Sequence, residues 1–428
     1  MKEISNIILF TISRTISELG TAVFKFALSL YVLDVTGSAS LFGIVLAISY
    51  LPNILINTFA GVYVDRADKK KVLVISELLS GVLIFLLFIL YSYQPENVIV
   101  LVLYSVLISA LQAFFSLAMN ASFPNLVSKE RLNAINSSNQ GISALLSIFG
   151  PVVGALAYTG IGFQNIFILD GISYLVSGIL IIFLRFSNTR DRSEDKDKPY
   201  IESLKEIGAY IKNRSAIKYL LFIFLMTNFV VSPSISLLLP FIVYQKFDMS
   251  ATQLSLIEAA LAVGFIVGAI LVSMKKVNAF VINKIFLMIQ MQGLLILLWV
   301  FPELNMIDTT MKGVLMAGYM GLLFFTGVFL AMGNIPMTSY AQMYIPEKIR
   351  GSFFGVMGTV VMIAIPIGTW LYGILLDQIS FTYVVIFSCV VLVVVGAFAH
   401  RSRDLREFFN RDSEPEADQP VVVTEKSM

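Results

Sequence analysis

Six polar side chains recur at helical spacing within the first apolar segment of this 428-residue chain. They are Thr11, Arg14, Glu18, Thr21, Lys25 and Ser29. Because a helix turns about 100° per residue, intervals of three and four residues place all six on one stripe. Charged side chains inside a bilayer normally face a cavity or a partner and mark a pathway. Two alternatives stay open: Arg14 and Glu18 can form a structural pair, and Lys25 can extend toward water at the span end.

Other acidic residues also lie within apolar segments. Glu258 stands in "QLSLIEAALAVGFIVGAIL" and Asp170 in "FILDGISYLV". Apolar surroundings disfavour a charged carboxylate, which makes Glu258 a candidate proton carrier, unless it lies near the outer water interface. For Asp170 we expect a role in packing or capping. Glu77 and Asp377 lie near the ends of apolar runs, and we assign them no special role.

The segments that must position these side chains are strongly apolar. Hydrophobic residues make up 57% of the chain and charged residues 14%, with a mean hydropathy of +0.84. A helix that crosses a bilayer needs about 20 mostly apolar residues. We therefore predict an all-α membrane protein with twelve spans, at 5–33, 39–64, 72–93, 97–120, 138–158, 163–186, 217–244, 252–274, 279–301, 313–338, 352–376 and 380–399.

The composition also excludes several kinds of site. One cysteine excludes an internal disulfide, and one cysteine with one histidine cannot build a zinc or iron–sulfur site from those ligands. The first apolar run is too long for a cleaved signal and lacks a basic head. No phosphate-binding loop or nucleotide-binding domain is evident. We therefore expect no cofactor, no enzymatic activity and no direct use of ATP.

The basic residues predict the orientation in the membrane. If both termini lie on one side, that side holds all but four of the 30 lysines and arginines. Two of the four, Arg14 and Lys25, belong to the first span, and only Lys246 and Lys312 lie in opposite loops. Basic residues concentrate on the cytoplasmic side. We therefore expect cytoplasmic termini in a multi-pass protein of a bacterial plasma membrane.

The turn between the second and third spans, "AGVYVDRADKKKVLV", combines acids and bases. Lys69 to Lys71 alone would suffice as a cytoplasmic anchor. Gly61 permits close backbone approach, and Asp65 can accept hydrogen bonds from a neighbouring helix N-terminus. Arg66 can bridge to a carboxylate of another cytoplasmic segment. Such contacts could close one side of two helical bundles reversibly.

This turn resembles the signature of the major facilitator superfamily. The matching residues are Gly61, Asp65, Arg66, Asp68, Lys69 and Lys70. Aspartate at position 68, where glycine is usual, is similar to the drug-exporter branch that includes macrolide efflux proteins and the enterobactin exporter. "TGSAS", "YLP" and "IPEKIRGSFFG" also look like that branch, as do the positions of Glu258 and Asp170. The resemblance extends to about residue 400 and implies two six-helix bundles.

The fifth span carries a further resemblance. Gly150, Pro151 and Gly154 of "GPVVG" look like the core of the family's antiporter motif. Helix bending and close packing explain these residues nearly as well.

An internal repeat supports two related halves. "VSKERL" follows the fourth span and "IPEKIR" the tenth, and each precedes a span with a central proline, Pro151 or Pro366. Parallel repeats of this kind occur in transporters. We predict an N-terminal bundle, a cytoplasmic linker with an amphipathic helix, a C-terminal bundle and a disordered tail, at 1–188, 189–216, 217–400 and 401–428.

Two classes of function compete. The first is a secondary transporter that works by alternating access, most simply a proton-coupled exporter of amphiphilic small molecules. Uptake by proton symport is its runner-up, because topology does not encode direction. The second class, a membrane enzyme or scaffold, has no supporting motif. The expected partners are a small-molecule substrate, protons and the lipid bilayer, without nucleic acid, and we expect a monomer.

Overall fold

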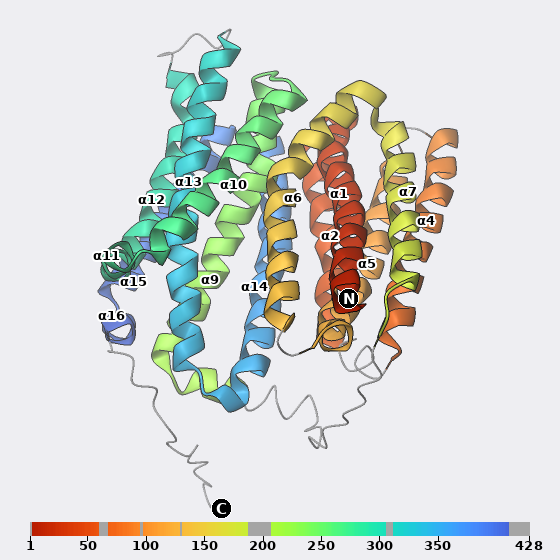
Figure 1. Cartoon of the computed structure of the whole chain (residues 1–428). Helices are drawn as coiled ribbons and strands as arrows, with labels where there is room; N and C mark the ends of the chain where they lie inside the picture. Colours follow the sequence, from red (N-terminus) through yellow and green to blue (C-terminus); the bar gives the residue numbers. More distant parts are fainter. Residues whose placement is uncertain are drawn as a thin grey trace, which may run out of the picture.

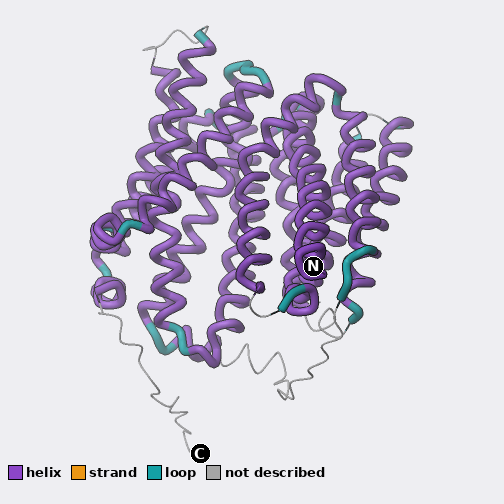
Figure 2. Tube along the Cα trace, viewed as in Figure 1, coloured by secondary structure: helices purple, strands orange, loops and turns teal. Residues whose placement is uncertain are grey.

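The computed structural model describes residues 2–59, 67–94, 97–128, 131–186, 207–304 and 311–410. Within these ranges the chain forms helices joined by short turns, without strands (Figure 2). Twelve of the described helices are long and apolar enough to cross a membrane, which confirms the predicted number. The start of the ninth span was wrong by six residues, because Lys275–Asn283 form a separate short helix, α11, before the span begins at Ile285.

The first half contains six spanning helices. They are α1 (Lys2–Thr36), α2 (Ala39–Phe59), α4 (Lys69–Tyr93), α5 (Val98–Leu126), α6 (Leu132–Ile161) and α7 (Phe163–Ile182). Helix α1 packs against α6 and α7, and α4 packs against α5 and α7. Helix α2 packs against α5 and completes this bundle.

The second half repeats this packing. Its spans are α9 (Ser215–Pro233) with the π-helical turns η2 (Ser234–Leu238) and η3 (Phe241–Lys246), α10 (Ala251–Ser273), α12 (Ile285–Leu297) with η4 (Leu298–Leu304), α13 (Lys312–Tyr344), α14 (Glu347–Gln378) and α15 (Phe381–Arg401). Helix α9 packs against α14 and α15, α12 against α13 and α15, and α10 against α13. Each of these helix pairs has a counterpart in the first half, formed by the two spans that lie six spans earlier in the chain. The repeat inferred from the sequence is therefore present in the packing.

Two helix pairs join the halves. Helix α2 packs against α14, and α6 packs against α10, so the two halves lie side by side (Figure 1). The first contact depends on glycine, because a Cβ atom at Gly43 would lie 2.9 Å from the backbone oxygen of Thr369. A Cβ atom at Gly373 would lie 2.8 Å from the backbone oxygen of Ala39. The missing side chains thus let the two backbones approach.

Helix α4 illustrates how the sequence separates inside from outside. Leucine and isoleucine side chains that face outward alternate with a buried, more polar face (exposed: Ile75, Leu79, Val82 and Leu86; buried: Leu73, Ser76, Glu77, Ser80, Gly81 and Ile84). Both sets recur at three or four residues, as expected for a helix with one face toward lipid and one toward protein.

The tail contains a helix that we did not expect. Residues Arg403–Asn410 form α16, so the prediction of disorder was wrong for this part. Leu405, Phe408 and Phe409 of α16 are buried, and the Phe409 ring centroid lies 5.7 Å from that of Phe286. The start of α1 and α16 lie toward the same end of the bundle (Figure 1). Most of the predicted linker helix lies outside the described residues, which resume as a helical turn at Ile207.

Candidate functional site

A cavity of about 1000 Å³ lies between the two halves. Helices α1, α2, α5 and α6 line it on one side, and η2, α10, α13 and α14 line it on the other. Its walls combine aliphatic and aromatic side chains with serine, threonine and amide groups. Among the described residues on these walls, Lys25 and Glu258 are the two charged ones. The cavity therefore suits a largely apolar molecule with a few polar groups.

The polar stripe of α1 divides into two parts. Thr21, Lys25 and Ser29 line the cavity. The hydroxyls of Thr21 and Tyr174 lie 2.7 Å apart, which fixes the Thr21 side chain between the cavity and α7. Lys25 lies eleven residues before the end of α1 at Thr36, and it places an amino group on the cavity wall.

The other part of the stripe joins α1 to α6. Arg14 Nε donates to Glu18 Oε1 at 2.6 Å, while its Nη1 and Nη2 donate to Asn139 O and Ser143 Oγ at 3.0 and 2.9 Å. Neither Arg14 nor Glu18 lines the cavity. This geometry matches the structural pair that the sequence left open, because each of the three guanidinium nitrogens of Arg14 has a partner within the first half.

Glu258 brings the second half's charge to the cavity. It is the eighth residue of α10, about 10 Å along the helix axis from its start at Ala251. Glu258 lines the cavity from the second half, and Lys25 lines it from the first half. A carboxyl group in this place can exchange a proton with whatever water or substrate fills the cavity.

Two further acids lie inside the first half. Asp170 is fully buried and accepts a hydrogen bond of 2.7 Å from the Tyr104 hydroxyl. A Cβ atom at Gly20 would lie 2.7 Å from Asp170 Oδ1, so α1 packs directly on this carboxyl group. Asp170 does not line the cavity, and its contacts are those of a packed interior residue.

Our expectation that Glu77 lies near the end of a span was wrong. Helix α4 begins at Lys69, so Glu77 lies two turns inside it and is fully buried. Ser17 Oγ donates to Glu77 Oε1 at 3.1 Å, while Glu77 Oε2 has no hydrogen-bond partner among the described residues. The sequence held a signal, since Ser80 and Gly81 follow Glu77 at three and four residues and mark a packed face.

The residues of the fifth-span motif make close contacts. A Cβ atom at Gly150 would lie 2.7 Å from Ala22 Cβ, and one at Gly154 would lie 3.0 Å from Phe26 Cβ. These two glycines therefore let α6 pack tightly on α1. Pro151 lies within continuous helix and lines the cavity.

Asp377 joins the second half to the start of α2, a contact that we did not expect from its sequence position. It is the penultimate residue of α14 in the second half. Its carboxylate accepts hydrogen bonds from Ser38 Oγ, Ala39 N and Ser40 N at 2.7, 2.8 and 3.1 Å. Asp377 thus caps the N-terminus of α2, where the unpaired N–H groups and the helix dipole favour an anion.

A second cluster strengthens the same end. Asp34 of α1 accepts hydrogen bonds from the hydroxyls of Tyr158 in α6 and Tyr244 in η3. Gln245 Nε2 also donates to Gly37 O at 2.9 Å. Because Tyr244 and Gln245 belong to the second half, these bonds hold the halves together near the α1–α2 turn.

The charged turn is only partly described. Gly61, Asp65 and Arg66 lie outside the described residues. Asp68 caps α4 by accepting from Lys71 N at 3.2 Å, and Lys69 begins the helix. Lys70 Nζ donates to Ile182 O and Leu184 O at 2.7 and 2.9 Å, so it satisfies carbonyls at the end of α7.

Cavity hydration can be tested at Thr21. Cys389 is the chain's single cysteine, so Cys389→Ser gives a cysteine-free background. We expect Thr21→Cys to react with a small water-soluble maleimide, because Thr21 lines the cavity. Ile179→Cys, on the lipid-facing side of α7, should stay unreactive. Protection of position 21 from reagents added on both sides would contradict a water-filled cavity.

Twelve spanning helices in two repeated bundles around a shared cavity define a membrane transporter of the two-bundle type. Residues 10–369 match the sequence model of the Major Facilitator Superfamily. The chain therefore belongs to the major facilitator superfamily, and it is a transporter, not an enzyme.

Named relatives include drug exporters. Macrolide efflux protein A of Streptococcus pyogenes is 25% identical over 400 residues, which cover 92% of this chain and 95% of the relative. The multidrug efflux pump Tap of Mycobacterium bovis is 23% identical over 90% of each chain. Among solved structures, an inward-facing bacterial homologue of the iron transporter ferroportin aligns with a TM-score of 0.71. It is 14% identical to this chain, and the match covers 95% of this chain and 99% of the homologue.

Proposed function

We propose that this protein exports amphiphilic small molecules across the cell membrane by alternating access, in exchange for protons. The observation that carries the proposal is the cavity between the halves, whose described walls are mostly apolar and present one lysine and one glutamate. Such a surface binds by shape and apolar contact, and is compatible with a range of substrates. The similarity to macrolide and multidrug efflux proteins supports export over uptake.

The conformation supports alternating access. Hydrogen bonds of Asp377 and Asp34 join the two halves at the α1–α2 turn, and we infer that they close the cavity at this end. By the distribution of basic residues this end faces outward, so we infer an inward-facing state. Asp65, in the turn at the opposite end, is the residue we expect to cap a helix when that end closes. Asp377 would then cap a helix in the inward-facing state, and Asp65 would do so in the outward-facing state.

The proton would be carried by Glu258. In the outward-facing state its carboxyl group would take a proton from outside, and in the inward-facing state it would release that proton into the cavity. Lys25 lines the same cavity from the first half, so both side chains would meet a substrate that occupies it. Substrate and proton could thus exchange within one cavity without ATP.

The proposal is tested by accumulation in cells. Cells that lack their own drug exporters should retain less radiolabelled erythromycin when they express the protein, and a protonophore should abolish the difference. The same comparison with tetraphenylphosphonium would show whether export extends beyond macrolides. Greater retention in expressing cells would indicate uptake and contradict the proposed direction.

The outer closure should depend on Asp377. We expect Asp377→Asn to weaken the cap of α2 by about 1 kcal/mol, since an amide retains only part of the anion's interaction with the helix terminus. That change should expose the cavity to the outside several times more often. The measurement is labelling of Leu254→Cys, which lies on the cavity wall in the first turns of α10, by an impermeant maleimide in intact cells. Equal labelling with and without Asp377→Asn would show that Asp377 does not hold the outer end closed.

A further inference from the structure

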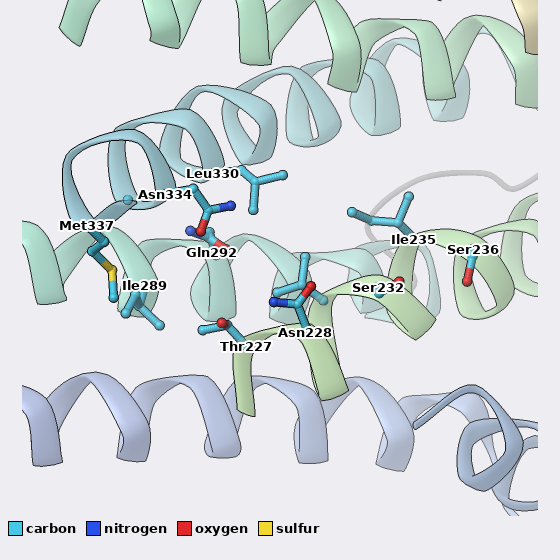
Figure 3. Close-up of a pocket in the computed structure, with 12 residues that line it drawn as sticks. Thr227, Asn228, Ser232, Ile235, Ser236, Ile289, Gln292, Leu330, Asn334 and Met337 are labelled. Atoms are coloured by element: carbon cyan, nitrogen blue, oxygen red, sulfur yellow. The ribbon is translucent and has the colours of Figure 1, made fainter. Parts of the chain in front are cut away.

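A second pocket lies inside the C-terminal half, beside the central cavity. It has a volume of about 280 Å³ and is lined by α9, η2, α12 and α13 (Figure 3). Ile235, Ser236 and Leu330 line both spaces, so the pocket adjoins the cavity wall. We call it the side pocket.

The side pocket is unusually polar for the interior of a membrane-embedded bundle. Half of its twelve lining residues carry hydroxyl or amide side chains: Thr227, Asn228, Ser232, Ser236, Gln292 and Asn334. None of the lining residues that the structure describes is charged. Polar groups inside a membrane protein are costly unless they find partners, so such a concentration points to a ligand or ordered water.

The two best-defined amides present acceptors. Asn228 Nδ2 donates to Phe224 O at 2.8 Å, and Gln292 Nε2 donates to Phe329 O at 3.3 Å. Because a backbone carbonyl can only accept, both amides must turn their nitrogens toward the backbone. Their oxygens are thereby left to accept from another donor, and Gln292 Oε1 is buried without a partner among the described residues.

The hydroxyls extend the same pattern. Thr227 Oγ1 donates to Ile223 O at 2.7 Å, which leaves its lone pairs available. Ser236 Oγ is buried without a hydrogen-bond partner in the described part of the chain, and it lies in the π-helical turn η2. Short π-helical segments inside helices occur frequently at functional sites. The pocket therefore has unmet acceptors on two different elements.

We propose that the side pocket is a subsite that binds a neutral, hydroxyl-bearing group of the exported molecule. The absence of charge on its walls disfavours an ion, because a buried charge without a counter-charge is strongly destabilised. Its volume lies just below the range of about 300–1,000 Å³ typical of sites for whole drug-sized ligands, so it admits one ring-sized group. The apolar body of the same molecule would occupy the central cavity across Ile235 and Leu330.

This inference rests on the proposed function, because it assigns the substrate's polar group to a place beside the transport cavity. It also predicts that the central cavity and the side pocket bind different parts of the substrate. The central cavity would bind by apolar contact and tolerate variety, while the side pocket would select molecules with hydrogen-bond donors. Loss of a donor from the ligand should then matter as much as loss of an acceptor from the protein.

The test measures binding of two probes to the purified full-length protein in lipid nanodiscs. Erythromycin carries hydroxyl-bearing rings, whereas tetraphenylphosphonium has no hydrogen-bond donor. We expect Gln292→Leu to raise the Kd for erythromycin by about five- to tenfold, the loss of one buried hydrogen bond. The Kd for tetraphenylphosphonium should not change.

A matched control stands two residues away on the same helix. Gln290 packs toward α15, where its Nε2 lies 3.5 Å from Val393 O, and it does not line the side pocket. Gln290→Leu makes the same chemical change and should leave both Kd values unaltered. A second variant, Gly333→Ala, adds a methyl group whose nearest atoms lie 3.6 and 3.8 Å away, so it narrows the pocket without a clash. It should weaken erythromycin binding alone.

The outcomes separate the two proposals. If erythromycin binds the wild type, Gln292→Leu and Gly333→Ala equally, or if Gln290→Leu weakens binding as much as they do, the side pocket is not a subsite. Unchanged tetraphenylphosphonium export would leave the proposed function standing in that case. If the wild type binds neither probe and exports neither, both the proposed function and the subsite are overturned.

Discussion

Export driven by a pH gradient is expected to fall by about tenfold or more in Glu258→Gln, while substrate binding persists. Glutamine retains the size and polarity of Glu258 on the cavity wall but cannot carry a proton through the cycle. Loss of the ionisable carboxyl group removes the coupled step itself. Loss of a single neutral contact of ~1 kcal/mol would instead weaken substrate binding by only about fivefold. The measurement is the initial rate of erythromycin export from energised cells at several external pH values.

The pH profile distinguishes coupling from simple damage. Wild-type export should increase as the external medium becomes more acidic, because protonation from outside is required for the return step, and Glu258→Gln should be nearly independent of external pH. Asp248→Asn is the matched control, since it neutralises an exposed acid near the start of α10 that lies off the cavity wall. Gradient-dependent export by Glu258→Leu would remove Glu258 from the mechanism.

The second large effect is expected when a bulky side chain is placed in the contact between α2 and α14. Gly43→Leu should abolish transport, because even a Cβ atom at this position would lie 2.9 Å from the backbone oxygen of Thr369. The added side chain would hold α2 away from α14 and keep the outer end open. We expect strong labelling of Leu254→Cys by an impermeant maleimide added outside, together with retained binding of tetraphenylphosphonium.

Gly160→Leu provides the control for a bulky side chain in a spanning helix. A Cβ atom at Gly160 of α6 has open space around it, so this variant should transport normally. Two results for Gly43→Leu would contradict this expectation: normal transport, or a cysteine at position 254 that still fails to react with the maleimide added outside. Either would show that the α2–α14 contact does not have to close during the cycle.

Most of the fold was predictable because hydropathy and helix length determine spans in a bilayer. The repeat was also visible, since related halves keep their prolines and charged turns. What could not be predicted was the partner of each polar residue. Asp377 and Ser38 are 339 positions apart, and their contact depends on how α14 packs against α2. Local sequence holds no information on how α14 aligns with α2, so the cap that Asp377 forms on α2 was not predicted.

The stripe of α1 shows the same limit at the level of the site. Its spacing correctly indicated one face of a helix, because periodicity depends only on helix geometry. It could not indicate that Arg14 would face Asn139 of α6 while Lys25 faced the cavity. The burial of Glu77 depends likewise on the packing of α4 against α7, next to Gly178, and its hydrogen bond comes from Ser17 of α1. Gln292 gave no signal, since a glutamine in an apolar run fits an interior contact equally well.

Transport by the purified protein in liposomes tests the central claim most directly. The liposome lumen is made acidic relative to the medium, and labelled erythromycin is added outside. The account predicts rapid accumulation beyond that in liposomes with Glu258→Gln or without protein, which correct for trapping of the basic drug, and collapse of the excess when a protonophore dissipates the gradient. Wild-type accumulation equal to that of the Glu258→Gln liposomes, or an excess that persists without a gradient, would contradict proton-coupled export.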